Sequence, residues 1–285
     1  MKTRYAFAAA LVLIASILPD LTFPSQYTLF VKLAVLLAMA ALCLLVERLK
    51  PLWKLAASLL TVNASFALTA AIRSAPGWAA LFSGAGFFQT IAGNVAVKLI
   101  GILPVAAVLF FLMGSWQKAF LTPGKLSEKA DAIGWLGIPG GSIPWGRLSV
   151  ISGLLIMTGT ALLSILTATG FHLPGGGGRL LQYFPLILLL ALVNSFCEGL
   201  VFRCAVLAPL KEGFPKMFAL LMPALFFGIA HYEGIPGGPL GAAMSGVLGW
   251  YMTRAIFETG GFLSGWIIHF LQDIAVFSTL ALLSQ

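Results

Sequence analysis

The chain has 285 residues and a formal net charge of +8, and 60% of its residues are hydrophobic while only 9% are charged. A soluble domain carries about 25% charged residues, because its surface must be hydrated. This composition excludes a soluble enzyme, a disordered scaffold and a disulfide-stapled secreted module. Long apolar runs at regular spacing instead predict an all-α fold, a polytopic transmembrane helical bundle, rather than a β-barrel.

About 20 apolar residues suffice to cross a bilayer. Nine runs are of about this length, near residues 5–19, 27–46, 55–72, 94–114, 148–169, 181–207, 217–231, 240–256 and 262–283. The first run is short, but no small-x-small cleavage site closes it, so we interpret it as a retained helix, which gives eight or nine spans. Residues 77–93 are rich in Gly, Ala and Ser and favour a re-entrant or interfacial segment over a further span.

The basic residues predict the orientation in the membrane. With the N-terminus in the cytoplasm, thirteen lie on that side: Lys2, Arg4, Arg48, Lys50, Lys54, Lys118, Lys125, Lys129, Arg147, Arg203, Lys211, Lys216 and Arg254. Lys32, Arg73 and Arg179 lie outside, and Lys98 is left near the outer start of the fourth span, from which it can extend to the interface. This asymmetry predicts an integral protein of a prokaryotic cell membrane with a cytoplasmic N-terminus. The basic residues form no patch with interleaved aromatics, so no nucleic-acid partner is expected.

The whole chain, residues 1–285, is predicted to form a single membrane domain. Within it we expect N-terminal helices over 1–114, a cytoplasmic loop over 115–147 and catalytic helices over 148–283. The ionisable residues inside apolar runs of the last part are Glu198, Arg203, His231, His269 and Asp273. Burying such groups costs several kcal/mol each unless they face a wet interior and one another, which predicts a functional site. The N-terminal helices are expected to form a lipid-facing wrap.

The expected depths of these residues favour one site. From the cytoplasmic helix ends, Glu198 and Asp273 lie about 18 Å deep, His231 about 22 Å and His269 about 12 Å. His269 and Asp273 are four residues apart and share a helix face. Glu198 and Arg203 are five apart and project about 140° apart on an ideal α-helix, so Arg203 either reaches back or extends to the interface.

Three short strings on consecutive apolar spans resemble the CPBP family of intramembrane proteases, which includes the CAAX prenyl endopeptidases and bacteriocin-processing proteins. The family pattern is Glu-Glu-x-x-x-Arg, Phe-x-x-x-His and His-x-x-x-Asn/Asp. The matching strings are Glu198-Gly199-Leu200-Val201-Phe202-Arg203, Phe227-Gly228-Ile229-Ala230-His231 and His269-Phe270-Leu271-Gln272-Asp273. The resemblance covers about residues 145–283. One departure is that Gly199 stands where the family has its second Glu.

The resemblance implies an intramembrane endopeptidase of the glutamic type, without a cofactor. Glu198 would activate the attacking water together with His231, while His269 and Asp273 would orient the site and stabilise the oxyanion. Arg203, Phe227 and Phe202 would support these residues. The residue chemistry is consistent with this, because peptide hydrolysis needs a base, a water and donors aimed at the developing oxyanion.

Two alternatives stay open. Glu198, His231, His269 and Asp273 are also a plausible ligand set for Zn²⁺ in a zinc-dependent protease, although the sequence has no HExxH. The missing second Glu also permits a non-catalytic membrane peptide-binding protein or a transporter. The expected partners are the lipid bilayer and a membrane-associated peptide or protein substrate. The family suggests a lipidated C-terminal peptide, a bacteriocin-type leader or a C-terminal membrane-anchor signal.

Overall fold

The computed structural model describes residues 2–24, 26–82, 86–169, 177–234 and 237–284. Within these residues the fold is all-helical, as predicted, and the only bridges are the isolated pairs Lys129 with Pro144 and Ile133 with Ile138. The connection expected at 170–176 lies outside the described residues.

The N-terminal part contains three long helices and three shorter ones. These are α1 (Lys2–Ala15), α2 (Leu18–Thr22), α3 (Thr28–Leu45), α4 (Trp53–Ser74), α5 (Pro76–Phe82) and α6 (Phe87–Met113). The segment 77–93 is divided between α5 and the first turns of α6, so the fourth predicted span begins earlier than expected. Gly114 ends α6 in the left-handed conformation, where glycine carries no steric penalty.

The C-terminal part begins after the loop that follows α6. Its elements are α7 (Trp145–Thr169), α8 (Gly177–Glu198), a π-helical turn η3 (Gly199–Cys204), α9 (Ala205–Leu210), α10 (Lys216–Ala230), α11 (Gly238–Thr259) and α12 (Leu263–Leu283). α8, η3 and α9 follow one another without a break and together form the span predicted at 181–207.

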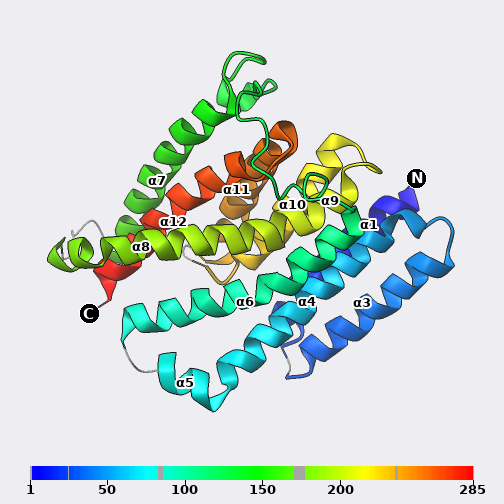
Figure 1. The fold of residues 1–285 in the computed structure, drawn as a ribbon, viewed down its shortest axis with the longest axis horizontal. Helices are drawn as coiled ribbons and strands as arrows, with labels where there is room; N and C mark the ends of the chain where they lie inside the picture. The colour runs from blue at the N-terminus through cyan, green and yellow to red at the C-terminus, as the bar shows by residue number, and fades with distance from the viewer. Residues whose placement is uncertain (1, 25, 83–85, 170–176, 235–236, 285) are drawn as a thin grey trace.

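The long helices form one bundle (Figure 1). α3 packs on α4, α4 on α6 and α6 on α8. α12 packs against both α7 and α8, and α10 packs against α11. The N-terminus and the α3–α4 connection lie at one end of the molecule, opposite the C-terminus. Which end faces the cytoplasm stays a prediction of the charge pattern.

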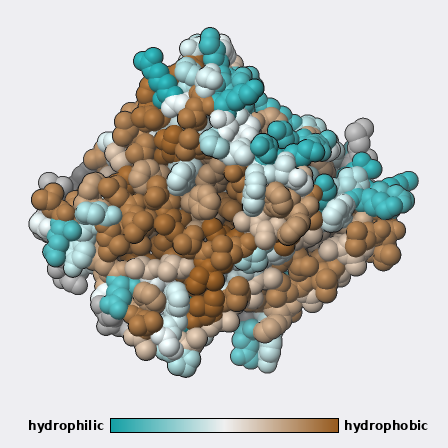
Figure 2. All heavy atoms as spheres, viewed as in Figure 1, coloured by the Kyte–Doolittle hydropathy of each residue, from teal (hydrophilic) through white to brown (hydrophobic). Residues whose placement is uncertain are grey.

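The surface is that of a protein surrounded by lipid. Figure 2 shows a broad hydrophobic area over the middle of one face, with hydrophilic residues gathered at its margins. Large apolar side chains stand far out of the fold, including Leu45 at 80% exposure and Phe111 at 79%. A soluble protein rarely exposes contiguous apolar surface on this scale.

Six helical stretches among the described residues are long and apolar enough to cross a membrane: Thr28–Leu45, Lys50–Ser74, Phe87–Met113, Trp145–Leu166, Leu180–Leu210 and Leu263–Leu283. Eight or nine spans are therefore not confirmed. α1 and α10 have 14 and 15 residues, fewer than the roughly 20 needed. α11 has 22 residues but carries Arg254 and Glu258 as an ion pair within its last turns.

Hydrogen bonds and ion pairs of Glu258 connect the loop that precedes α7 to the end of α11. Its carboxylate pairs with Arg254 and Lys216 at 2.7 and 2.8 Å and accepts a 2.8 Å hydrogen bond from the Trp145 indole. Lys216 also donates to Asp131 of the loop, which lowers the pKa of that carboxyl. This network fixes where α7 starts and places the loop residue Trp135 against Trp250 of α11.

Candidate active site

A cavity of about 1160 Å³ lies between α6, α7, α8, α11, α12 and the end of α10. All four predicted catalytic residues line it, and two of its other lining residues, Lys98 and Asn194, contact them directly. The six are Lys98, Asn194, Glu198, His231, His269 and Asp273. The structure therefore brings the predicted constellation together around one space large enough for a peptide segment.

A π-helical turn directly after Glu198 determines where Arg203 lies. The Ala205 amide donates to the Leu200 carbonyl, five residues back, so residues five apart lie nearly above one another in this turn. The separation of about 140° expected on an ideal α-helix therefore does not apply to Glu198 and Arg203. Arg203 is 1% exposed, and its guanidinium lies 4.3 Å from the centre of the Phe227 ring.

Arg203 fixes the protonation pattern of His269. The Arg203 Nη1 atom lies 3.2 Å from His269 Nδ1. A guanidinium can only donate, so Nδ1 must accept and the proton of the neutral imidazole must be on Nε2. His269 Nε2 lies 3.6 Å from both Glu198 Oε2 and Asp273 Oδ1. The ring therefore presents an N–H between two carboxylates at a distance longer than a hydrogen bond.

His231 has the opposite pattern. It lies at the end of α10, where its Nδ1 atom is 2.9 Å from the Phe227 carbonyl. A carbonyl can only accept, so Nδ1 carries the proton and Nε2 has a free lone pair. The Phe227 ring contacts both imidazoles, with centroid distances of 4.2 Å to His231 and 5.6 Å to His269. Phe202 packs against Phe227 in turn. The supporting roles expected of both rings stay a prediction.

Lys98 connects the two carboxylates of the site. Its ammonium lies 2.7 Å from Glu198 Oε1 and 2.6 Å from Asn194 Oδ1. Asn194 in turn donates from Nδ2 to Asp273 Oδ2 at 2.9 Å. Glu198 thus has one oxygen bound by Lys98 and one, Oε2, directed at His269.

Two expectations from the sequence are corrected by this contact. Lys98 does not extend to the membrane interface, and the N-terminal helices are not only a lipid-facing wrap, because α6 supplies a cation to the site. The hydrogen bond from Arg203 determines which nitrogen of His269 carries the proton. Asp273 instead accepts a hydrogen bond from the Asn194 side chain. One sequence signal pointed to Lys98: a charged residue inside an apolar span is costly and usually has a partner.

The position of the missing second carboxylate is filled. A Cβ atom on Gly199 would lie 2.6 Å from the tip of the Phe262 ring and 3.8 Å from Arg203 Nη1. Phe262 is buried and packs against Phe196 and Trp266. An aromatic ring therefore occupies the space into which a side chain at 199 would point, and this side of Glu198 is dry.

The four predicted residues fit a zinc site poorly. Among the described residues, no group of three or more His, Cys, Asp or Glu side chains is arranged to hold a metal ion. The Lys98 ammonium also occupies Glu198 Oε1, and a cation in contact with a carboxylate opposes binding of a second cation there.

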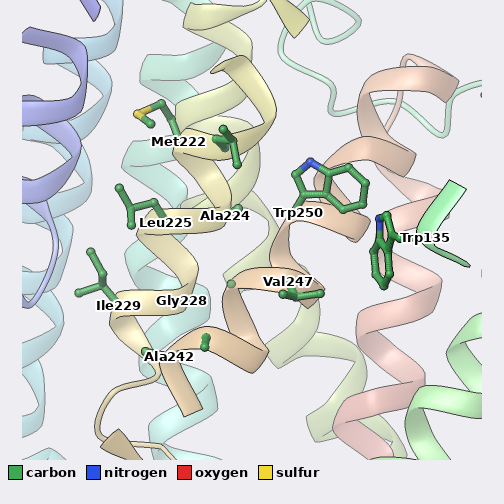
Figure 3. Close-up of a pocket in the computed structure, with 12 residues that line it drawn as sticks. Trp135, Met222, Ala224, Leu225, Gly228, Ile229, Ala242, Val247 and Trp250 are labelled. Carbon is green, nitrogen blue, oxygen red and sulfur yellow. The ribbon is translucent and has the colours of Figure 1, made fainter. Parts of the chain in front are cut away.

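A second cavity of about 750 Å³ adjoins the first between α10 and α11 (Figure 3). Figure 3 shows Leu225 and Ile229 on one helix and Val247 and Trp250 on the other. All of its lining residues are apolar or glycine, and it shares Trp135 and Val247 with the main cavity. We call this space the apolar groove.

Comparison with known families gives a match over part of the chain. Residues 180–275 match the family model described as type II CAAX prenyl endopeptidase Rce1-like. This part of the chain is similar to the CAAX protease family. The matched segment includes Asn194, Glu198, Arg203, His231 and His269, and it ends just after Asp273.

This Rce1-like family is described as endopeptidases, so the match supports a peptide hydrolase, and the six long apolar stretches of the described residues support an integral membrane protein. The match covers about a third of the chain and leaves out α6, which carries Lys98. The comparisons with curated proteins and with solved structures found no significant match.

The Phe262 ring beside Gly199 generates a prediction. Gly199→Ala should lower the stability by about 1–3 kcal/mol, because overpacking a filled core forces side chains out of place. Phe262→Leu should relieve the clash. The double variant Gly199→Ala/Phe262→Leu should therefore lose less stability than the two single variants lose together. Thermal unfolding of the four proteins in one detergent measures this. Additive losses would show that Phe262 does not limit the space at position 199.

Proposed function

We propose that this protein hydrolyses a peptide bond within the membrane by a glutamic-type mechanism in which Glu198 activates water. The supporting observation is the arrangement around Glu198 Oε2. This oxygen faces the cavity, His231 offers a free Nε2 lone pair to the same cavity, and His269 presents an Nε2 proton 3.6 Å away. Hydrolysis of a carbonyl compound needs acceptors that bind the attacking water, here Glu198 and His231, and a donor for the oxyanion, here His269.

The steps follow from these roles. A water held by Glu198 Oε2 and His231 Nε2 gives a proton to Glu198 as its oxygen attacks the scissile carbonyl carbon. The oxyanion that forms accepts the hydrogen bond of His269 Nε2–H, which Arg203 directs into the cavity from the other side of the ring. Glu198 then passes its proton to the leaving nitrogen, and the C–N bond breaks. The carboxylate is regenerated and one water is consumed.

This mechanism is proposed to need no metal. The arrangement of Lys98 on Glu198 supports that reading, since the ammonium already neutralises the carboxylate that a zinc ion would need. Activity should survive prolonged dialysis against a strong chelator, and added Zn²⁺ should not raise it. Loss on chelation with recovery on Zn²⁺ would favour the zinc alternative.

The catalytic set generates a second prediction. Glu198→Gln, His231→Ala and His269→Ala should each lower kcat by about 100-fold or more, since each removes a group used in one transition state. Double variants should be scarcely slower than the single ones, because such groups act as a unit. Cleavage of a fluorogenic peptide by purified protein in detergent or nanodiscs measures kcat for each.

Glu233 provides a matched control for Glu198. It is an exposed glutamate that also lines the main cavity but contacts none of the groups around Glu198 Oε2 in the described hydrogen bonds and ion pairs. Glu233→Gln should keep nearly full activity. A loss at Glu233 equal to that at Glu198, or a Glu198→Gln protein that still turns over, would overturn the assignment of the base. A protein that binds peptide but never cleaves it would favour the non-catalytic alternative.

The apolar groove favours a substrate with a lipid chain among the classes that the family suggests. It has no charged side chain in its wall, its volume of about 750 Å³ suits a long hydrocarbon, and it shares the lining residues Trp135 and Val247 with the main cavity. A hydrocarbon in the groove would lie next to a peptide whose scissile bond is at Glu198. The matched family is described as prenyl endopeptidases, which agrees with this proposal.

Filling the groove tests the proposed substrate class. Ala243 is exposed on α11 and lines the groove, so Ala243→Phe should fill part of it without displacing a core side chain. KM for a peptide with an S-prenylated cysteine should rise about tenfold, while KM for the same peptide without the lipid should not change. Leu240→Phe, exposed on α11 outside the groove, is the control. Equal effects on both peptides would contradict a lipid-binding role.

A further inference from the structure

Lys98 belongs to α6, which lies outside the segment that matches the protease family. It is 100 residues before Glu198 in the sequence and near the middle of a 27-residue apolar helix. An ammonium at such a depth is costly, and it is tolerated when it faces a wet interior and a counter-charge. Here 42% of the Lys98 side chain is exposed, on the wall of the main cavity.

We propose that Lys98 is a positioning residue for hydrolysis, which holds Glu198 as a carboxylate with Oε2 directed into the cavity. This inference rests on the proposed function of Glu198 as the base. Lys98 acts on Glu198 directly through Oε1, at 2.7 Å. It acts on the opposite side of the site through Asn194, whose carbonyl oxygen it binds at 2.6 Å.

The hydrogen bonds of Asn194 fix the orientation of its side-chain amide. An amide has one accepting oxygen and one donating nitrogen. With Oδ1 bound by Lys98, the Asn194 Nδ2 group is turned to Asp273 Oδ2, at 2.9 Å. A single ammonium therefore orients both carboxylates of the site.

The charges of the site support this role. Two carboxylates, Glu198 and Asp273, lie beside His269. Two cations are in contact with the same cluster, Arg203 through His269 and Lys98 through Glu198. Arg203 approaches from the side where Phe262 fills the space next to Gly199, so its guanidinium reaches the imidazole rather than Glu198. Of these two cations, Lys98 makes the direct ionic contact with Glu198.

Lys98 also differs from Lys32, a lysine in a structural ion pair. Lys32, at the start of α3, pairs with Asp20 at 2.7 Å and has only 7% of its side chain exposed. It lines neither cavity. Lys98 forms a pair of the same length but keeps a large part of its surface in the cavity, where an ammonium has a third N–H to offer. The two lysines are a matched pair for an experiment.

The test measures kcat, KM and thermal stability for variants at both lysines in the purified full-length protein. Lys98→Met should lower kcat about 100-fold with KM within about twofold, because the base is misplaced while the substrate site is intact. Lys98→Arg should recover most of the kcat, since it keeps the charge and two donors. Lys32→Met should lower stability without changing kcat. If Lys98→Met does not fold, Lys98→Gln takes its place with the same expected fall in kcat.

Chemical rescue separates positioning from a merely structural role. Lys98→Ala should regain kcat in a saturable way on addition of ethylammonium, which fits the space left by the side chain. Tetramethylammonium has the same charge but no N–H and should not restore it. The proposal is overturned if Lys98→Met keeps kcat within about threefold of the parent. It is also overturned if neither Lys98→Arg nor ethylammonium restores activity to a folded protein.

The failure of this inference is distinguishable from failure of the proposed function. Glu198→Gln is measured in the same assay. If it remains active, Glu198 is not the base and the proposed function fails. If it is inactive while Lys98→Met is active, only the role of Lys98 fails.

Discussion

Charge compensation in an apolar interior is the constraint on which the site depends. Glu198 and Asp273 lie on helices long enough to span a membrane, where an uncompensated carboxylate costs several kcal/mol. The structure meets this cost with Lys98 and Arg203, which enter from different helices and contact different members of the cluster. Removing one partner would leave the opposite charge of the cluster without its counter-charge, so the four groups keep each other in place.

The backbone supports this compensation by departing from regular geometry. The turn Gly199–Cys204 is π-helical, and Arg203 within it contacts His269. The α10 helix ends immediately before His231, which frees the Phe227 carbonyl for the imidazole. Both features place a side chain at the site, and π-turns are frequent at functional sites. The two histidines therefore have opposite tautomers because different backbone and side-chain groups bind their Nδ1 atoms.

Much of this could be predicted from the sequence. The apolar runs predicted an all-helical fold, and the intramembrane charges indicated residues that the structure places around one cavity, including Glu198, His231 and His269. The eight or nine predicted spans were not confirmed: among the described residues α10 is too short by length, and α11 carries Arg254 and Glu258 in its last turns. The division into 1–114, 115–147 and 148–283 stays a prediction.

Two features could not be predicted for physical reasons. The Lys98–Glu198 contact joins residues 100 positions apart and has no local pattern, since it depends on how α6 packs on α8. The π-turn depends on packing around Gly199, where Phe262 fills the space beside the glycine. Charge, depth and spacing identified candidates, whereas the contacts that orient them came from the tertiary structure.

Isotope labelling tests most directly whether Glu198 activates water. The protein would cleave one equivalent of peptide in H₂¹⁸O, and mass spectrometry would follow the label in the product and in the Glu198 side chain. Attack by an activated water places one ¹⁸O in the new product carboxylate and none in Glu198. Incorporation of ¹⁸O into Glu198 during that single turnover would show that the carboxylate itself attacked the substrate, and it would contradict the role assigned here.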